Sequence, residues 1–194
     1  MSLVSSWVAR WAPLAPPGKV LDLACGMGRH AHHFAALGHP VLAVDRDASA
    51  LIHAAGEGIV TVHADLESED ATCAAQRALI LRPGQFATIV VTNYLHRPLM
   101  AALLASLAPD GMLIYETFAA GNEAYGKPSN PAFLLQPGEL QALADAAGLR
   151  VLAVEDVHVM TPNEALIGRI CAVGPAFTLP NVKLDVSGGL SSQE

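Results

Sequence analysis

Short apolar runs alternate along the chain with segments whose apolar residues recur at helical spacing. Runs of strand length occupy residues 20–24, 41–44, 59–63, 87–92 and 112–117. The segments between them predict helices over residues 29–37, 48–55, 72–81 and 98–107. A strand–helix repeat of this kind is typical of a parallel sheet that helices cover on both faces.

The two ends of the chain depart from this repeat. Apolar spacing predicts a helix over residues 3–12, and Pro109, Asp110 and Gly111 are expected to break the helix 98–107. Residues 137–147 form a predicted helix before strands 151–159 and 165–173, whose short connection indicates an antiparallel hairpin. Residues 119–136 are rich in Gly, Asn, Pro and Ser, and this long connection is expected to be a functional loop. We expect one domain over residues 1–175, including an N-terminal helix and linker (1–18), and a loosely ordered tail over 176–194.

A glycine-bearing turn follows the first predicted strand, in the stretch VLDLACGMGRH. Gly26 and Gly28 allow a ligand to approach the backbone closely, and the helix that follows presents free N–H groups. Ligands of open α/β sheets bind at the carboxyl ends of the strands. Asp45 ends the second strand, where a carboxylate accepts hydrogen bonds from ribose hydroxyls. Asp65 follows the third strand, within reach of an adenine amino group.

Two ligand classes fit this turn. Residues 26–31 satisfy the pattern G-x-G-x-x-A, which favours a nicotinamide dinucleotide and an NAD(P)-dependent oxidoreductase. Asp22, inside the strand, would repel a pyrophosphate but suits a ligand with a cationic amino group, such as S-adenosylmethionine. A non-catalytic protein that binds S-adenosylmethionine is a third interpretation, because a binding pocket does not establish chemistry.

The stretch DLACGMG, residues 22–28, resembles the first motif of class I S-adenosylmethionine-dependent methyltransferases. This resemblance implies a Rossmann-like three-layer sandwich with a seven-stranded, mostly parallel sheet and a C-terminal antiparallel hairpin. It also implies methyl transfer from S-adenosylmethionine, here to a small or medium-sized acceptor. The cofactor-binding residues implied by the resemblance are Asp22, Ala24, Gly26, Gly28, Asp45, Asp65, Leu66 and Asn93.

Several positions depart from the family pattern. Ala24 replaces the first motif glycine, and Ala87 stands where an Asp often opens the fourth strand. No Asn-Pro-Pro-Tyr sequence follows that strand, which argues against methylation of an adenine or glutamine amino group. Gly-x-Gly-Arg and the following helix look most like the small-molecule subset that includes tellurite-resistance and thiopurine methyltransferases.

The segment after the fourth strand supplies the candidate catalytic residues, His96 and Tyr94. An unperturbed imidazole pKa of about 6.5 suits proton removal from an acceptor that arrives protonated. The alternative for His96 is a hydrogen bond to a neighbouring loop. Glu116 and Tyr125 are further candidates.

The amino-acid composition limits the classes of partner, the metal sites and the cellular location that we expect. The 194 residues carry 11 basic and 18 acidic side chains, a formal charge of −7, which disfavours a large nucleic acid. Three scattered cysteines show neither a disulfide framework nor zinc spacing, and the clustered histidines lack a completing ligand, so no metal site is expected. The most apolar segment, residues 99–108, is too short to span a bilayer. A cytoplasmic protein without a membrane partner is therefore expected.

Overall fold

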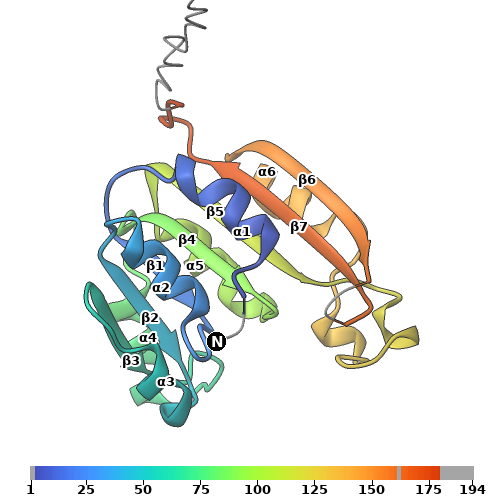
Figure 1. Cartoon of the computed structure of the whole chain (residues 1–194), viewed down its shortest axis with the longest axis horizontal. Helices are drawn as coiled ribbons and strands as arrows, with labels where there is room; N and C mark the ends of the chain where they lie inside the picture. Colours follow the sequence, from blue (N-terminus) through green and yellow to red (C-terminus); the bar gives the residue numbers. More distant parts are fainter. Residues whose placement is uncertain (1–2, 161–162, 180–194) are drawn as a thin grey trace, which may run out of the picture.

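A seven-stranded sheet lies between two layers of helices in the computed structural model, which describes residues 3–160 and 163–179 (Figure 1). The strands are β1 (Val20–Leu23), β2 (Val41–Asp45), β3 (Ile59–His63), β4 (Phe86–Thr92), β5 (Leu107–Phe118), β6 (Arg150–Val159) and β7 (Ala165–Val173). The α-helices are α1 (Ser6–Trp11), α2 (Arg29–Ala36), α3 (Ala48–Ala54), α4 (Ala71–Ile80), α5 (Met100–Ala105) and α6 (Glu139–Ala146). Four 3₁₀ turns complete the described elements: η1 (Ala12–Leu14), η2 (Arg97–Leu99), η3 (Asn122–Ala124) and η4 (Pro131–Phe133).

The strand order is β3-β2-β1-β4-β5-β7-β6, and it confirms the expected fold class. Strands β3, β2, β1, β4 and β5 pair in parallel. Strand β7 is antiparallel to both β5 and β6, so the predicted C-terminal hairpin is confirmed. The chain winds outward from β1 to β3 and then returns to place β4 on the other side of β1. Ligands of open α/β sheets bind at such a reversal, outside the carboxyl ends of the strands.

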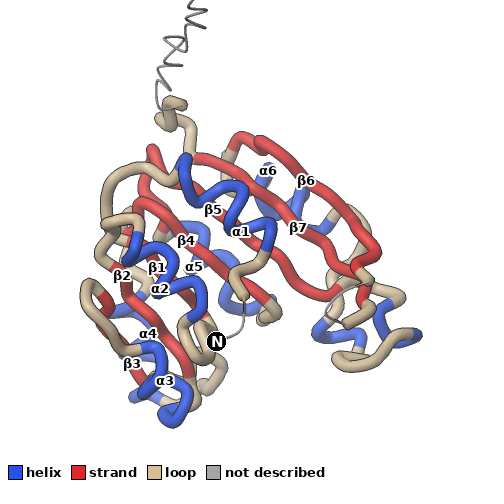
Figure 2. Tube along the Cα trace, in the orientation of Figure 1, coloured by secondary structure: helices blue, strands red, loops and turns tan. Residues whose placement is uncertain are grey.

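Each face of the sheet has its own apolar core. Helices α1, α2 and α3 pack on one face, and α4, α5 and α6 pack on the other, as the tube view also shows (Figure 2). Consecutive residues of a strand point to opposite faces. Ile114 therefore belongs to the core under α1 and α2, while Tyr115 belongs to the core under α4 and α5.

The predicted helix 98–107 is shorter than expected, and the strand after it is longer. Helix α5 ends at Ala105, and β5 already begins at Leu107, so Pro109, Asp110 and Gly111 lie within a strand. Pairs with β4 at Leu107 and Met112 lie on either side of these residues, and the Gly111 carbonyl accepts a hydrogen bond of 2.9 Å from the Gly174 N–H, so contacts across the sheet keep the chain extended here. Leu107 pairs with Phe86, and an irregularity in the register absorbs the extra residues before Met112. The carbonyl of Pro109 also accepts a hydrogen bond from the Ala176 N–H at 2.9 Å.

That last contact extends the packed chain beyond the predicted boundary at residue 175. Phe177 is 5% exposed and belongs to the core under α1 and α2. The burial of an aromatic side chain holds the first residues of the predicted tail against the sheet. Residues 180–194, the rest of that predicted tail, lie outside the described residues.

Candidate functional site

The turn between β1 and α2 uses its two glycines differently. Both have left-handed backbone, with φ of 53° at Gly26 and 77° at Gly28. A Cβ at Gly28 would lie 2.6 Å from the Ala54 Cβ, so this glycine allows α2 to pack against α3. A Cβ at Gly26 would meet nothing within 4 Å. Gly26 is therefore the position at which a ligand finds open space over bare backbone.

Ala24, which replaces the first motif glycine, keeps the backbone conformation of a glycine. Its φ is 54°, a left-handed value that costs a residue with a Cβ roughly 1–2 kcal/mol. The cost is small enough for packing around the turn to offset. Ala24 therefore adopts a backbone conformation that a glycine at this position would adopt without strain.

Asp45 connects the end of β2 to this turn. Its Oδ2 accepts a hydrogen bond of 2.7 Å from the Gly26 N–H, and its Oδ1 accepts one of 2.8 Å from the Asp47 N–H. Two candidate residues separated by 19 positions in sequence therefore touch. An ionised carboxylate has about four lone-pair positions, so Asp45 retains acceptor capacity for a ligand.

Asp22 is buried beneath the same turn. It is 1% exposed, and its Oδ2 accepts a hydrogen bond of 2.8 Å from the Ala31 N–H in the first turn of α2. Burial raises the pKa of this carboxyl to about 7, although the Ala31 hydrogen bond and nearby Arg29 oppose the shift. In this structure Asp22 joins β1 to the start of α2 and holds the glycine turn between them.

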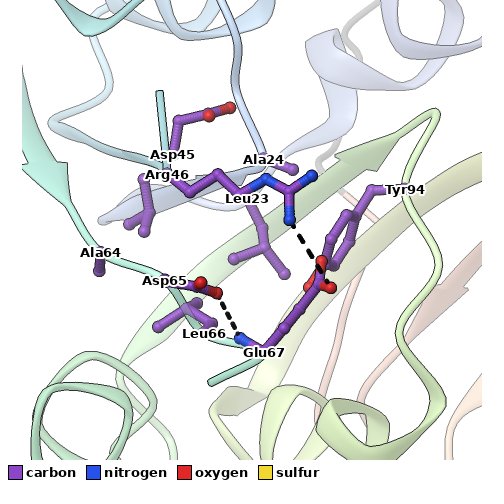
Figure 3. Close-up of a pocket in the computed structure, with 10 residues that line it drawn as sticks. Leu23, Ala24, Asp45, Arg46, Ala64, Asp65, Leu66, Glu67 and Tyr94 are labelled. Carbon is purple, nitrogen blue, oxygen red and sulfur yellow. Dashed lines mark hydrogen bonds and ion pairs between the residues drawn. The ribbon is translucent and has the colours of Figure 1, made fainter. Parts of the chain in front are cut away.

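A cavity of about 150 Å³ opens beside Asp45 at the carboxyl ends of β1, β2 and β3 (Figure 3). Its apolar wall includes Leu23, Val44 and Leu66, and its acidic side chains include Asp45 and Asp65. The Oδ1 of Asp65 accepts a hydrogen bond of 2.9 Å from the Glu67 N–H, which closes a tight turn after β3. Apolar walls with few acceptors at the rim suit a flat ring that carries polar groups on its edge.

Tyr94 lines the same cavity, across from Asp65 (Figure 3). Burial and the nearby Glu67 carboxylate raise the pKa of the Tyr94 phenol, so it stays neutral. Glu67 also forms an ion pair with Arg46 at 3.8 Å. Arg46 and Glu67 are cavity residues that sequence reasoning did not select, and their signal was their position beside Asp45 and Asp65. The structure thus groups Tyr94 with the cofactor-binding candidates.

The segment after β4 places the other candidates near the sheet edge. Asn93 is exposed, with φ of 55°, and its N–H donates to the Glu116 carbonyl at 3.0 Å. His96 precedes η2 and is partly buried, and its imidazole has no hydrogen-bond partner among residues 3–160 and 163–179. The catalytic role of His96 therefore stays a prediction.

Arg97 fastens the long connection 119–136 to α6. Its guanidinium donates to both carboxylate oxygens of Glu139 at 2.7 and 2.8 Å, and to the carbonyls of Ala132 and Leu134. A guanidinium bonded in this way holds a fixed geometry. All the partners of Arg97 are distant in sequence, so the local pattern, which here predicts only the helix 98–107, does not indicate these contacts.

No three His, Cys, Asp or Glu side chains in the described ranges gather closely enough to hold a metal ion. Within those ranges, no helix combines the length and apolar character that crossing a bilayer requires.

Comparison with known proteins supplies a family and a fold. Residues 2–154 match the model of a family described as methyltransferase domain. No curated protein matched the sequence significantly.

Solved structures share the fold at low sequence identity. TehB from Haemophilus influenzae superposes with a TM-score of 0.70 at 17% identity, covering 90% of this chain and 63% of that one. A TehB-like SAM-dependent methyltransferase from Corynebacterium glutamicum gives 0.59 at 20% identity, with coverages of 87% and 86%. The 1,6-didemethyltoxoflavin-N1-methyltransferase of Burkholderia thailandensis, with bound 1,6-didemethyltoxoflavin and S-adenosylhomocysteine, gives 0.59 at 21% identity, with coverages of 87% and 76%. This chain therefore spans less than two thirds of the TehB chain.

Proposed function

Because this chain belongs to the methyltransferase-domain family, we propose that it transfers a methyl group from S-adenosylmethionine to a small or medium-sized acceptor. The matched residues include the glycine turn, Asp45, Asp65 and the segment after β4. Family membership favours this function over the nicotinamide-dependent oxidoreductase that the glycine pattern also suggested.

The observation that carries the proposal is the contact of Asp45 with the Gly26 N–H at the edge of the cavity. Asp45 would bind the ribose hydroxyls, and the cavity would hold the adenine between Leu66 and Tyr94, with Asp65 near its amino group. The amino-acid end would lie over Gly26, with Ala24 and Asn93 beside it. Asp22 and Gly28 would keep the turn in shape beneath it.

The sulfonium supplies an activated methyl group, so the protein contributes mainly position. Holding an acceptor atom in line with that methyl provides much of the rate by proximity and orientation. His96 is the proposed base for an acceptor that arrives protonated. Tyr94, whose pKa is raised, serves as a neutral hydrogen-bond donor at the cofactor rather than as a base.

Calorimetric titration with S-adenosylhomocysteine tests the cofactor site. We expect Asp45→Asn to weaken binding by about 10- to 100-fold, because a charge-assisted hydrogen bond contributes roughly 1.5–3 kcal/mol. Asp47→Asn is the matched control: Asp47 caps α3 two residues away, Asn caps equally well, and affinity should stay within about twofold. Binding of NAD(P) but not of S-adenosylhomocysteine by the folded protein would refute the proposal.

The net charge and the free cysteines support the proposed class of acceptor and a cytoplasmic location. The formal charge of −7 favours a small acceptor over a nucleic acid. Cys25, Cys73 and Cys171 are free, which suits the cytoplasm. The fold shared with TehB agrees with the small-molecule subset that the sequence resembles.

A further inference from the structure

Glu116 is a mostly enclosed acid whose carboxylate has no partner among the described residues. It lies near the carboxyl end of β5 and is 7% exposed, yet its carboxylate forms no hydrogen bond or ion pair with any of the described residues. Its carboxylate oxygens are not among the fully buried polar atoms that lack a partner in the described structure, so they reach solvent at this edge of the sheet. A side chain that is mostly enclosed while its carboxylate stays open and unpaired can accept hydrogen bonds from a ligand.

Thr92 lies directly beside Glu116. The two residues are register partners on the parallel strands β4 and β5, which lie about 4.8 Å apart in a sheet. Partners in register point to the same face, and here this is the face that α1 and α2 cover, because Glu116 is two residues from Ile114.

His30 determines which way the Thr92 hydroxyl donates. The Ser5 N–H donates to His30 Nε2 at 3.3 Å, so this nitrogen carries no proton. Burial lowers the pKa of His30 to about 3, so the ring is neutral and its proton is on Nδ1. Nδ1 lies 3.4 Å from Thr92 Oγ1 and therefore donates to it. The Thr92 hydroxyl proton remains available to a further acceptor.

The position of this pair relative to the proposed cofactor site is fixed by strand order. The nucleoside end lies at the ends of β2 and β3, and the glycine turn follows β1. Strands β4 and β5 come next in the sheet. Thr92 and Glu116 are therefore on the side of the glycine turn away from the nucleoside, where an acceptor has to reach the methyl group.

We propose that Glu116, with the Thr92 hydroxyl beside it, binds the methyl acceptor and selects one that presents an uncharged nitrogen bearing an N–H. This inference rests on the proposed function. The carboxylate accepts the N–H, and the Thr92 hydroxyl donates to an acceptor atom elsewhere on the ligand. An anionic acceptor is repelled by Glu116.

The Glu116 carboxylate also stabilises the positive charge that methyl transfer creates and accepts the proton that is released. A nitrogen–carbon bond forms from the nitrogen lone pair, and the sulfur–carbon bond breaks with its electron pair left on sulfur. The nitrogen then carries a positive charge, which Glu116 stabilises. For an N–H acceptor of this kind, Glu116 takes the proton in place of His96: the N–H bond breaks after methyl transfer and leaves its electron pair on nitrogen, and the proton moves to a Glu116 carboxylate oxygen and from there to water.

The melting temperature of a Glu116 variant distinguishes an acid that binds a ligand from one that stabilises the fold. We expect Glu116→Gln to change the Tm of the ligand-free protein by less than about 2 °C, because its carboxylate has no partner in the described structure to lose. The matched control is Glu155→Gln on β6, since Glu155 accepts hydrogen bonds from Arg169 and Arg10 and its loss should lower the Tm. A fall in Tm as large as that of Glu155→Gln would overturn the inference, because it would show that Glu116 is paired within the fold.

Binding of three ring-matched probes tests the selectivity. With saturating S-adenosylhomocysteine at pH 7.5, NMR titration should show aniline binding more tightly than anisole or benzoate. Glu116→Gln should reduce this preference by about five- to tenfold, because charge-assisted hydrogen bonds are the stronger ones. Equal binding of the three probes, no binding of any, or an unchanged preference in the variant would overturn the inference. Calorimetry with S-adenosylhomocysteine on both proteins keeps the two proposals apart: normal binding leaves the proposed function standing, and failed binding refutes it.

Discussion

At the scale of single residues, the two glycines of the β1–α2 turn have separable purposes. Gly28 is required because α3 leaves no room for a Cβ, whereas Gly26 faces open space beside Asp45. The same motif therefore contains one position that concerns folding and one that concerns the ligand.

Alanine at each position tests this division. Gly28→Ala should lower the free energy of unfolding by about 2–5 kcal/mol, the sum of overpacking and left-handed strain. Gly26→Ala should cost only the strain, about 1–2 kcal/mol, yet weaken S-adenosylhomocysteine binding at least tenfold. Urea denaturation and calorimetry measure the two effects. Wild-type affinity in folded Gly26→Ala protein, or equal destabilisation by both changes, would contradict the division.

At the scale of elements, the connection between β1 and α2 depends on the buried carboxyl group of Asp22. The Asp22 pKa is raised from 3.8 to about 7, mainly by burial, so the folded protein binds this proton more tightly than the unfolded chain does. At pH values between 3.8 and about 7, Asp22 is ionised in the unfolded chain but still protonated in the folded protein. The contribution of Asp22 to stability therefore falls as pH rises from about 4 to about 7.

Asp22→Asn should remove this dependence while keeping the side-chain size and an oxygen for the Ala31 N–H. The variant should gain stability over the wild type by up to about 1.4 kcal/mol per pH unit between pH 5 and 7, then level off. Urea denaturation at several pH values measures the difference, in which the opposite shift at His30 cancels because both proteins contain it. Parallel stability curves for the two proteins would rule out this origin of the pH dependence.

At the scale of the whole molecule, α1 joins the beginning of the chain to its C-terminal hairpin. Trp7 is 1% exposed, and its Nε1–H donates to the Ile170 carbonyl in β7 at 3.1 Å. The Arg169 guanidinium lies 4.7 Å from the centre of the Trp7 ring. Helix α1 thus lies across β5 and β7 on the face that also holds Thr92 and Glu116 (Figure 1).

Trp7 and Trp11 provide a matched pair for testing this connection. Trp7→Phe should lower the free energy of unfolding by about 1–3 kcal/mol, because a buried carbonyl loses its indole donor. The Trp11 Nε1 has no hydrogen-bond partner in the described structure, so Trp11→Phe should cost less than about 1 kcal/mol. Urea denaturation followed by far-UV circular dichroism measures both. Similar costs for the two variants would show that the Ile170 hydrogen bond does not decide the stability of this contact.

The sequence by itself determined the order and type of the elements, the mostly parallel sheet and the position of the glycine turn. These features depend on local periodicity and on backbone preferences that neighbouring residues settle. The match to a strand–turn–helix motif, with an acid after each of the next two strands, also predicted the cofactor candidates that meet around the cavity.

Only the tertiary structure decided which side chains meet across distant segments. It extended β5 through Pro109, because pairs with β4 on either side of this residue and a hydrogen bond from the Ala176 N–H outweigh a local turn preference. It places Tyr94 in the wall of the cavity and pairs Arg97 with Glu139. It also brings Glu116 beside Thr92, where the Glu116 carboxylate has no partner in the described part of the chain. The physical reason is that hydrogen bonds, burial and charge pairing depend on distances between strands and helices that lie far apart along the chain.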